Sequence, residues 1–325
     1  MAVMTLAQGV TAGLDAVLEK HSETMIFGED VGLNGGVFRI TDGLQKKFGE
    51  DRVFDTPLAE SGILNMSIGL ATEGFRPIPE IQFGGFLFQA MDALAGQMTR
   101  IGYRYGGTRR CPVTIRTPFG GGVHTPELHS DNMEFLVSQI PGLRVVMPSN
   151  AHDAKGLLIA SVESNDPVVF FEHLRMYRTI KDEVPDGYYT VDLDKAAITC
   201  EGKDVSIITY GLMVHESLKA AEELAKDGID VEIVDLRTLA PLDTETIINS
   251  VSKTHRVVIA QEAQRNGGVG AMVASEISER AFMQLDAPIK RVAAPDTPFA
   301  FGAAEAAWMP NAADIVAAVR ETVDF

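Results

Sequence analysis

The sequence predicts an α/β fold made of two successive units, each with a mostly parallel sheet covered by helices on both faces. Short apolar runs of strand length alternate with amphipathic stretches along most of the chain, and its 325 residues suffice for two domains. The alternation stops once, where charged residues, proline and glycine follow one another without a regular period. We therefore expect domains at residues 1–175 and 203–325, joined by a linker at residues 176–202.

The first unit opens with a helix. Thr5 and Gln8 have the spacing of a capping box, and Leu14 and Leu18 fall on one face of a helix that we expect to end near Lys20. Strands are expected after it at residues 25–28, 52–54, 77–82, 113–117, 144–147 and 168–171. Helices are expected between these strands at residues 60–73, 86–103 and 151–163. Since the strand segments are apolar rather than alternating, we expect them to be buried on both faces.

The second unit shows the same alternation of strand and helix. Strands are expected at residues 205–210, 231–236, 256–261 and 289–292. Helices are expected at residues 215–226, 244–252, 270–285 and 312–323. Gly228 follows the first of these helices and suits a left-handed helix end, because glycine adopts positive φ without a steric penalty.

Composition and charge exclude several classes of protein. The 45 acidic residues outnumber the 28 basic ones, which argues against nucleic-acid binding and a polybasic membrane anchor but permits a basic partner. The two cysteines form no metal or disulfide pattern. No apolar run reaches the length of about 18 residues that a membrane span needs. Without a signal-peptide pattern either, we expect a soluble protein of a reducing compartment.

Two segments that follow predicted strands are candidate sites, because ligands bind at the carboxyl ends of parallel strands. Glu60 begins a predicted helix, where the backbone dipole favours a carboxylate, but it could also be an ordinary helix-start acid. His124 and His129 lie in a loop with three consecutive glycines, which predicts a mobile or unusually shaped segment. As bare histidines, both could equally be structural. A dinucleotide-binding pattern is absent, which disfavours a nicotinamide oxidoreductase.

Several blocks of residues together resemble the β subunits of thiamine-diphosphate-dependent 2-oxo acid dehydrogenases, most closely the bacterial pyruvate dehydrogenase type. The blocks are residues 26–32, 55–62, 79–83, 118–130 and 231–238. The resemblance implies an N-terminal pyrimidine-binding domain with the thiamine-diphosphate fold and a C-terminal transketolase-like domain. It also implies an α2β2 enzyme whose cofactor lies between α and β subunits. Since this chain lacks the Gly-Asp-Gly of the diphosphate half, Mg²⁺ and the diphosphate are expected on the α subunit.

The resemblance also assigns site residues by position. Glu60 matches the glutamate that shares a proton with the pyrimidine ring of the cofactor and so activates it. Leu58, Gln82 and Phe86 match positions that pack around this ring. His129 matches a histidine implicated in handling the bound intermediate and its transfer to lipoyl groups. For His124 the resemblance implies no role.

Further positions concern ions, a proton relay and docking. Some relatives hold potassium through backbone carbonyls at positions matching Val113, Ser161, Val162, Ser164 and Asp166. Ser164 stands where an acidic residue is common, and Gln89 stands where close relatives carry a glutamate of a proposed proton relay. Asp286 and the terminal carboxylate of Phe325 match contacts to the basic subunit-binding domain of the dihydrolipoyl acyltransferase core.

The resemblance thus predicts oxidative decarboxylation of pyruvate together with an α subunit, followed by reductive acetylation of lipoyl groups. A branched-chain 2-oxo acid or acetoin dehydrogenase β subunit is the alternative with the same fold and cofactor. A non-catalytic subunit that only docks onto a multienzyme core is an alternative of a different class. The expected compartment is the bacterial cytoplasm, or the mitochondrial matrix if the chain is processed.

Overall fold

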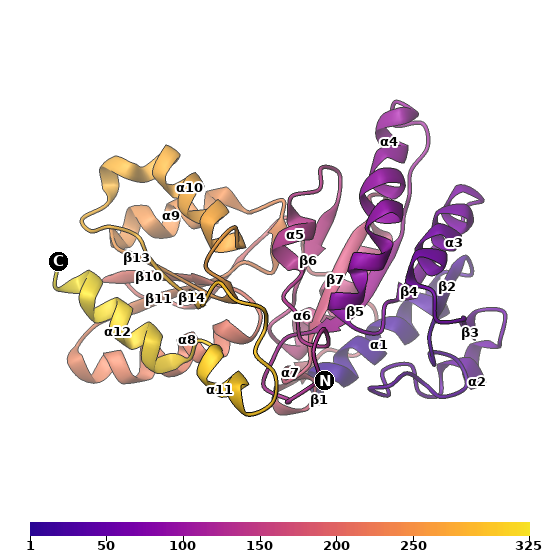
Figure 1. Cartoon of the computed structure of the whole chain (residues 1–325), viewed down its shortest axis with the longest axis horizontal. Helices are drawn as coiled ribbons and strands as arrows, with labels where there is room; N and C mark the ends of the chain where they lie inside the picture. The colour runs from indigo at the N-terminus through magenta and orange to yellow at the C-terminus, as the bar shows by residue number, and fades with distance from the viewer.

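The computed structural model describes residues 1–325, the whole chain. Two α/β domains lie next to each other, with the N-terminal domain on the right of Figure 1 and the C-terminal domain, which ends in α12 (Ala312–Val323), on the left. Each domain has its own sheet, so the predicted two-domain α/β fold is confirmed. No helix of the structure has both the length and the apolarity needed to span a bilayer.

The N-terminal domain surrounds a seven-stranded sheet of order β12-β6-β7-β5-β4-β2-β3, in which only β12 runs antiparallel to its neighbour. Its strands are β2 (Thr24–Gly28), β3 (Val53–Asp55), β4 (Arg76–Glu80), β5 (Thr114–Phe119), β6 (Arg144–Val146), β7 (Val168–His173) and β12 (Thr238–Ala240). Its α-helices are α1 (Leu6–Lys20), α2 (Leu44–Phe48), α3 (Glu60–Thr72), α4 (Ile101–Arg104), α5 (Glu134–Ser138), α6 (Ala151–Glu163) and α7 (Met176–Thr179).

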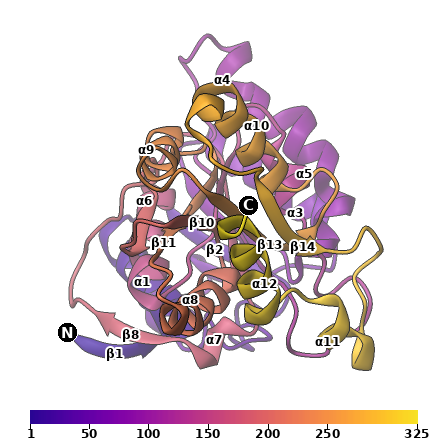
Figure 2. The ribbon, with the colours of Figure 1, turned by 90° about the vertical axis from the view of Figure 1, so that its left-hand side faces the viewer.

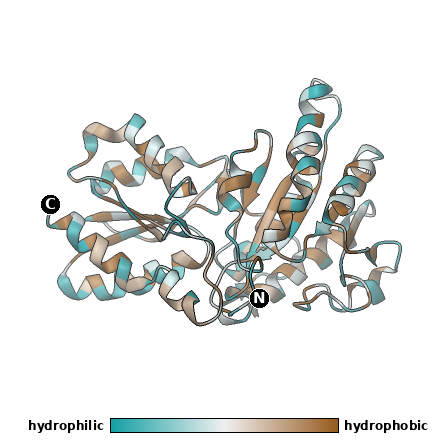
Figure 3. Cartoon of the chain, in the orientation of Figure 1, coloured by the Kyte–Doolittle hydropathy of each residue, from teal (hydrophilic) through white to brown (hydrophobic).

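Helices cover both faces of this sheet, as the apolar strands require. Ile26 and Phe170 point to one face and belong to a core cluster with residues of α1 and α6. Their neighbours Phe27 and Phe171 point to the other face and pack in a cluster with α3 and the segment leading to α4. Figure 3 shows the strands of this sheet in brown, the colour of apolar residues. The predicted capping box is present, with Thr5 and Gln8 binding each other's backbone N–H.

The prediction of one regular helix at residues 86–103 was wrong. The segment consists of a 3₁₀ stretch (Gly84–Ala90), a π-helical stretch (Asp92–Gln97), a second 3₁₀ turn (Met98–Arg100) and α4. Its start lies against another loop: a Cβ on Gly85 would collide with the carbonyl oxygen of Leu128. This close packing favours tight turns. The spacing of apolar residues does not reveal whether a helical segment is α, 3₁₀ or π.

The C-terminal domain surrounds a five-stranded sheet of order β14-β13-β10-β11-β9, with β9 antiparallel to β11. Its strands are β9 (Ala197–Cys200), β10 (Val205–Thr209), β11 (Val231–Asp235), β13 (Val257–Gln264) and β14 (Lys290–Ala294). Its other helices are α8 (Leu212–Leu224), α9 (Thr244–Thr254), α10 (Val269–Ala281) and α11 (Glu305–Trp308). Gly228 has φ 77°, the predicted left-handed conformation.

Several elements connect the two domains. β12 follows β11 in the chain but joins the N-terminal sheet next to β6. Residues 176–202, expected as a linker, contain α7, β9 and the strand β8 (Lys181–Val184), which pairs with the N-terminal β1 (Ala2–Thr5). Figure 2 shows this β1–β8 ribbon side by side at the lower edge. The largest apolar cluster also contains residues of both domains, so the two domains share a continuous core.

Candidate functional site

Glu60 lies buried at the carboxyl edge of the N-terminal sheet. β3 ends at Asp55, whose carboxylate accepts the N–H groups of Gly32 at 2.7 Å and Leu33 at 3.1 Å, and the chain then turns into α3 at Glu60. The Glu60 side chain is 2% exposed, and its Oε2 has no hydrogen-bond partner. A buried polar atom without a partner is unfavourable, so this oxygen is available to a group from outside the chain.

Glu29 is a second buried carboxyl group near Glu60. It follows β2, is 8% exposed, and has an Oε1 atom without a partner. Burial raises the pKa of Glu29, and the negative charges of Glu60 and Asp30 raise it further. No sequence pattern assigned a role to Glu29, although it lies within one of the family-like blocks. Only the folded arrangement shows that β2 and β3, which are neighbours in the sheet, bring the two carboxyl groups together.

The three residues expected around the pyrimidine ring differ in exposure. Leu58, in the turn before α3, is 76% exposed in the single chain. Gln82 follows β4 and is half-buried, as is Phe86 in the adjoining 3₁₀ stretch. Gln89 is exposed. The segments around Glu60 and Gln82 thus follow strands of the same sheet, while Leu58 faces solvent.

His129 lies against two phenylalanine rings. Its ring centroid is 4.3 Å from that of Phe83 and 5.3 Å from that of Phe86, so the structure brings two predicted site residues together. The His129 Nδ1 atom lies 2.8 Å from the carbonyl oxygen of Glu127. Because a carbonyl oxygen only accepts, we assign the proton of the neutral ring to Nδ1, which leaves Nε2 as a free acceptor.

The glycine-rich loop before His129 is tightly packed, which explains its three glycines. A Cβ on Gly120 would collide with the His173 ring, and one on Gly122 would lie 2.5 Å from Arg175 Cδ. Any larger residue would push these neighbours away. The loop therefore has an unusual shape that close contacts dictate, the second of the two possibilities that the sequence left open.

Two carboxylates of the C-terminal domain bind this loop. Glu262 on β13 accepts the Gly121 N–H at 2.9 Å and lies 2.7 Å from Nε2 of the buried His173. Glu305 on α11 accepts backbone N–H groups of the loop and lies 2.9 Å from Nδ1 of His124. No local pattern predicts these contacts, because the residues involved are far apart in the chain.

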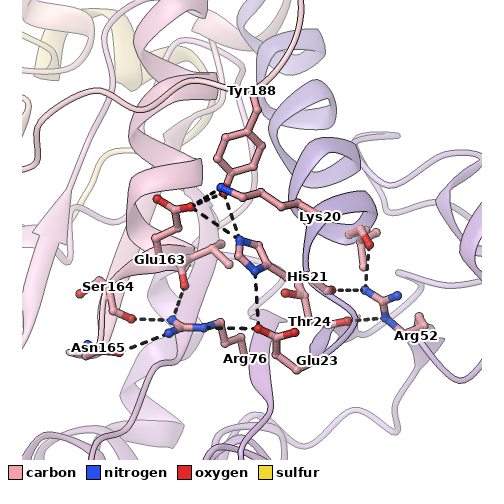
Figure 4. Close-up of polar contacts among 12 residues, drawn as sticks. Lys20, His21, Glu23, Thr24, Arg52, Arg76, Glu163, Ser164, Asn165 and Tyr188 are labelled. Carbon is pink, nitrogen blue, oxygen red and sulfur yellow. Dashed lines mark hydrogen bonds and ion pairs between the residues drawn. The ribbon is translucent and has the colours of Figure 1, made fainter.

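The carbonyls expected to bind potassium lie at the opposite, amino edge of the sheet. Figure 4 shows Arg76 at the start of β4 within a polar cluster of His21, Glu163 and Tyr188. Arg76 Nη1 donates to the carbonyl oxygens of Val162 at 2.7 Å and Ser164 at 3.0 Å.

The other three carbonyls are also satisfied within the chain. Val113 O accepts from Val168 N at 2.9 Å, Ser161 O accepts from Ser164 N at 3.2 Å, and Asp166 O accepts from Ser164 Oγ at 3.2 Å. The structure contains no group of three or more His, Cys, Asp or Glu side chains that could hold a metal ion. Each of the five carbonyl oxygens thus already accepts a hydrogen bond, two of them from Arg76, and potassium would have to use their second lone pairs. Potassium binding here stays a prediction.

The two expected docking residues lie at the surface of the C-terminal domain. Asp286 is 57% exposed at its side chain, with Oδ2 3.9 Å from Arg256 Nη2. Phe325 is 79% exposed at the end of the chain after α12. A cavity of about 690 Å³ lies elsewhere, beside α4, and Glu60 and His129 do not line it.

Residues 2–179 match the family of transketolase pyrimidine-binding domains, and residues 194–315 match the transketolase C-terminal domain. Over the full length of both proteins, the chain is 59% identical to the pyruvate dehydrogenase E1 component subunit beta of Staphylococcus aureus. The chain belongs to the family of pyruvate dehydrogenase E1 beta subunits. The subunit of the same name from Staphylococcus epidermidis is 57% identical, also over the full length of both chains. The resemblance predicted from the sequence is thereby confirmed.

A solved structure supports the fold independently. The protein described as "Split gene transketolase, inactive beta4 tetramer" superposes with a TM-score of 0.81 over 99% of this chain and 98% of that chain, at 24% identity. At this identity the likeness concerns the fold alone. Within the family, the orphaned carboxyl oxygens of Glu60 and Glu29 fit a cofactor ring that carries nitrogen donors.

Proposed function

We propose that this chain is the β subunit of an α2β2 pyruvate dehydrogenase and supplies the pyrimidine half of a thiamine diphosphate site. The α subunit would hold Mg²⁺ and the diphosphate. The assembled enzyme would decarboxylate pyruvate and transfer the acetyl group to lipoyl groups of an acyltransferase core. The observation that carries the proposal is Glu60 Oε2, a buried carboxyl oxygen without a partner in the pyrimidine-binding domain of this family.

Glu60 and Glu29 would govern proton sharing at this site. Thiamine diphosphate, when bound, supplies a nucleophilic carbon and an electron sink. Glu60 Oε2 would hold a proton between itself and a ring nitrogen of the cofactor. Burial and the nearby charge of Glu60 raise the pKa of Glu29, because two buried negative charges at this place repel each other. Burial of both side chains excludes water from the shared proton.

The surface beside Glu60 supports the need for a partner subunit. Leu58 is 76% exposed and Met66, on α3, is 38% exposed. On the same helix, a Cβ added to Gly69 would have no neighbouring atom within 4 Å. A partner that covers this uncharged face would bury Leu58 next to Glu60, where we expect Leu58 to pack on the cofactor ring.

His129 would act on the substrate side of the site. Its Nε2 atom is free to accept a proton or, once protonated, to donate one, while the rings of Phe83 and Phe86 hold the imidazole plane. Such a group suits transfer of the acetyl group to a lipoyl sulfur. This role requires the loop around His129 to stay in a defined position.

Assembly onto the acyltransferase core would use the C-terminal domain. Asp286 and Phe325 are both exposed, and the chain carries a formal net charge of −17. A basic docking domain would be attracted to this surface in a salt-dependent manner. The compartment we propose is the bacterial cytoplasm, whose reducing conditions suit the two free cysteines.

The test is reconstitution with an α subunit and replacement of Glu60. We expect Glu60→Gln to lower thiamine-diphosphate-dependent pyruvate decarboxylation by about 10² to 10⁴, the usual contribution of proton transfer by a positioned side chain. Glu73→Gln, a matched change of an exposed residue at the end of the same helix, should leave the rate unchanged. Full activity of the Glu60 variant would contradict the assigned role.

Substrate choice is tested in the same assay. Turnover is compared on pyruvate, 2-oxoisovalerate and acetoin, with cofactor and α subunit held constant. Pyruvate should be the preferred substrate. Preference for either of the others would assign the chain to a branched-chain or acetoin enzyme. Failure to bind cofactor with any α subunit would instead favour a docking subunit without catalytic function.

A further inference from the structure

Of the two C-terminal-domain carboxylates that bind the loop carrying His129, Glu305 accepts the larger number of its backbone N–H groups. Glu305 at the start of α11 is 1% exposed. Its Oε1 accepts the N–H groups of Gly122 and Val123, the latter at 3.2 Å, and its Oε2 accepts that of His124 at 2.9 Å. Three consecutive N–H groups of the loop therefore converge on one anion, an arrangement that binds negative charge strongly.

The His124 side chain adds a further contact to the same carboxylate. Its Nδ1 atom lies 2.9 Å from Glu305 Oε2 and 3.1 Å from the carbonyl oxygen of Gly302. The backbone of His124 has φ 56°, a left-handed conformation that residues other than glycine rarely adopt. The contacts to Glu305 hold this residue in that conformation, so the loop shape depends on the carboxylate.

Packing of the loop against the C-terminal domain reinforces this contact. Glu262 accepts the N–H of Gly121 at 2.9 Å. A Cβ on Gly121 would lie 2.6 Å from Met309 Sδ, 2.7 Å from Phe299 Cζ and 3.0 Å from Glu305 Oε1. Residues 121–124 are thus held by the C-terminal domain, although they belong to a loop of the N-terminal domain.

The far end of the loop is held by the N-terminal domain. The Leu128 carbonyl lies so close to Gly85 that no Cβ fits between them, and His129 lies against Phe83 and Phe86. Thr125 and Ser130 contact each other through their hydroxyl groups and close the loop between its two ends. The position of His129 therefore depends on both attachments.

We propose that Glu305 is a positioning residue for His129, acting from the other domain by fixing residues 122–124. The catalytic use of His129 in this inference rests on the proposed function. The dependence of the loop conformation on Glu305 does not rest on it. Without the carboxylate, three loop N–H groups lose their acceptor, and the His124 ring keeps only its contact with the Gly302 carbonyl oxygen. The loop then samples other shapes, and His129 spends less time in the orientation that transfer to lipoyl groups needs.

The first experiment is a double-mutant cycle on the enzyme assembled with its α subunit. Glu305→Ala should lower the rate of lipoyl acetylation by about tenfold to a hundredfold, the effect expected from a misplaced reacting group. Decarboxylation followed with an artificial electron acceptor should fall much less. In a His129→Ala background, Glu305→Ala should change the acetylation rate by less than about twofold, because the two residues act as one unit.

Two further variants distinguish a positioning role of Glu305 from a general loss of folding. Glu305→Gln keeps an acceptor oxygen and should retain more acetylation activity than Glu305→Ala. Glu216→Ala is the matched control, because Glu216 is also a mostly buried acid of the C-terminal domain that accepts a backbone N–H, that of Ala312 at 3.2 Å. It should leave acetylation unchanged. Additive losses in the double-mutant cycle, or equal losses in the Glu216 control, would overturn the proposal.

The second experiment does not depend on activity. Hydrogen exchange of the assembled protein, read by mass spectrometry, should become faster at residues 122–124 and 128–131 in Glu305→Ala but not in Glu216→Ala. Unchanged exchange at residues 128–131 would overturn the proposal. If the wild-type assembly shows no decarboxylation, the proposed function fails, and the exchange measurement still decides whether Glu305 holds the His129 segment.

Discussion

Two regions of the same sheet bury carboxylates in opposite ways. Around Arg116 on β5, each buried carboxylate is paired with the guanidinium group. Nε lies 2.6 Å and Nη2 2.8 Å from the two oxygens of Glu172, and Nη1 lies 2.7 Å from Glu80 Oε2. Tyr177 donates to Glu172 at 2.7 Å. At Glu29 and Glu60, by contrast, one oxygen of each carboxyl group has no partner.

The two regions are close neighbours in the sheet. Glu80 on β4 is in register with Gly28, the residue before Glu29, and with Arg116 on the other side. A fully paired set of buried charges is complete within the chain and holds strands together. An unpaired buried carboxyl group destabilises the chain alone and is retained where another molecule completes it. The difference makes Glu29 and Glu60 candidates for binding another molecule, whereas the carboxylates around Arg116 are complete within the chain.

The largest expected effect comes from removing the arginine of the paired region around Arg116. Arg116→Met removes the only cation between two buried carboxylates and should lower the free energy of unfolding by about 3–5 kcal/mol. Denaturant unfolding of the purified chain measures this loss. Arg178→Met, at an exposed arginine of α7, serves as the control and should stay within about 0.5 kcal/mol of wild type. A small loss at Arg116 would mean that the paired region does not stabilise the sheet.

A pH-dependent effect should appear at Glu134, a third buried acid with an unpartnered oxygen. Its Oε1 accepts from Tyr210 at 3.1 Å, while Oε2 has no partner, and burial together with the charge of Glu262 raises its pKa to about 7. An unfolded chain has a glutamate pKa of about 4.3, so the native state binds more protons between these values. The contribution of Glu134 to stability therefore falls as pH rises from about 4 to about 7.

Replacing Glu134 with glutamine should remove this dependence. The free energies of unfolding of Glu134→Gln and wild type should agree near pH 4, and the variant should be more stable at pH 8 by on the order of 3–4 kcal/mol. Denaturant unfolding across this pH range measures the difference. A constant offset between the two proteins at all pH values would show that Glu134 titrates normally.

The smallest effect concerns the stability of the unpaired region. Glu60→Gln, which should abolish most activity, removes a charge that repels Glu29 and should raise the free energy of unfolding of the chain alone by about 1 kcal/mol. Thermal unfolding of the unassembled chain checks this expectation. A clear loss of stability would contradict this expectation. It would show that Glu60 stabilises the chain alone, as the paired carboxylates around Arg116 do.

The regular parts of the fold were predictable from the sequence because their signals are local. Apolar runs marked most strands of both sheets, and the Thr5 and Gln8 pattern marked the start of α1. The strands β1, β8, β9 and β12 escaped prediction. Each has only three or four residues and lies at the edge of its sheet, where no long buried apolar run is needed. Their pairing depends on partners far away in the chain.

The candidate site likewise contains residues that local sequence signals indicated and residues that they did not. Glu60 and His129 became candidates because each follows a strand within a family-like block, whereas the sequence singled out neither Glu29 nor Glu305. The proximity of Glu29 to Glu60 becomes visible only when β2 and β3 lie side by side, and Glu305 reaches its loop across a domain boundary. A sequence pattern identifies residue types at the ends of elements, but it does not show which distant carboxylate binds which backbone N–H.

The placement of β12 has a consequence for how this chain can be divided or recombined. A truncated chain that stops after the first domain would lack the strand that covers β6, and the open edge of the sheet would invite pairing with other molecules. A single crossover in the linker would place the β12 strand of one parent against the β6 strand of the other. Chimeras that keep residues 1–202 together with residues 238–240 from the same parent should remain dispersed, while those that separate them should aggregate.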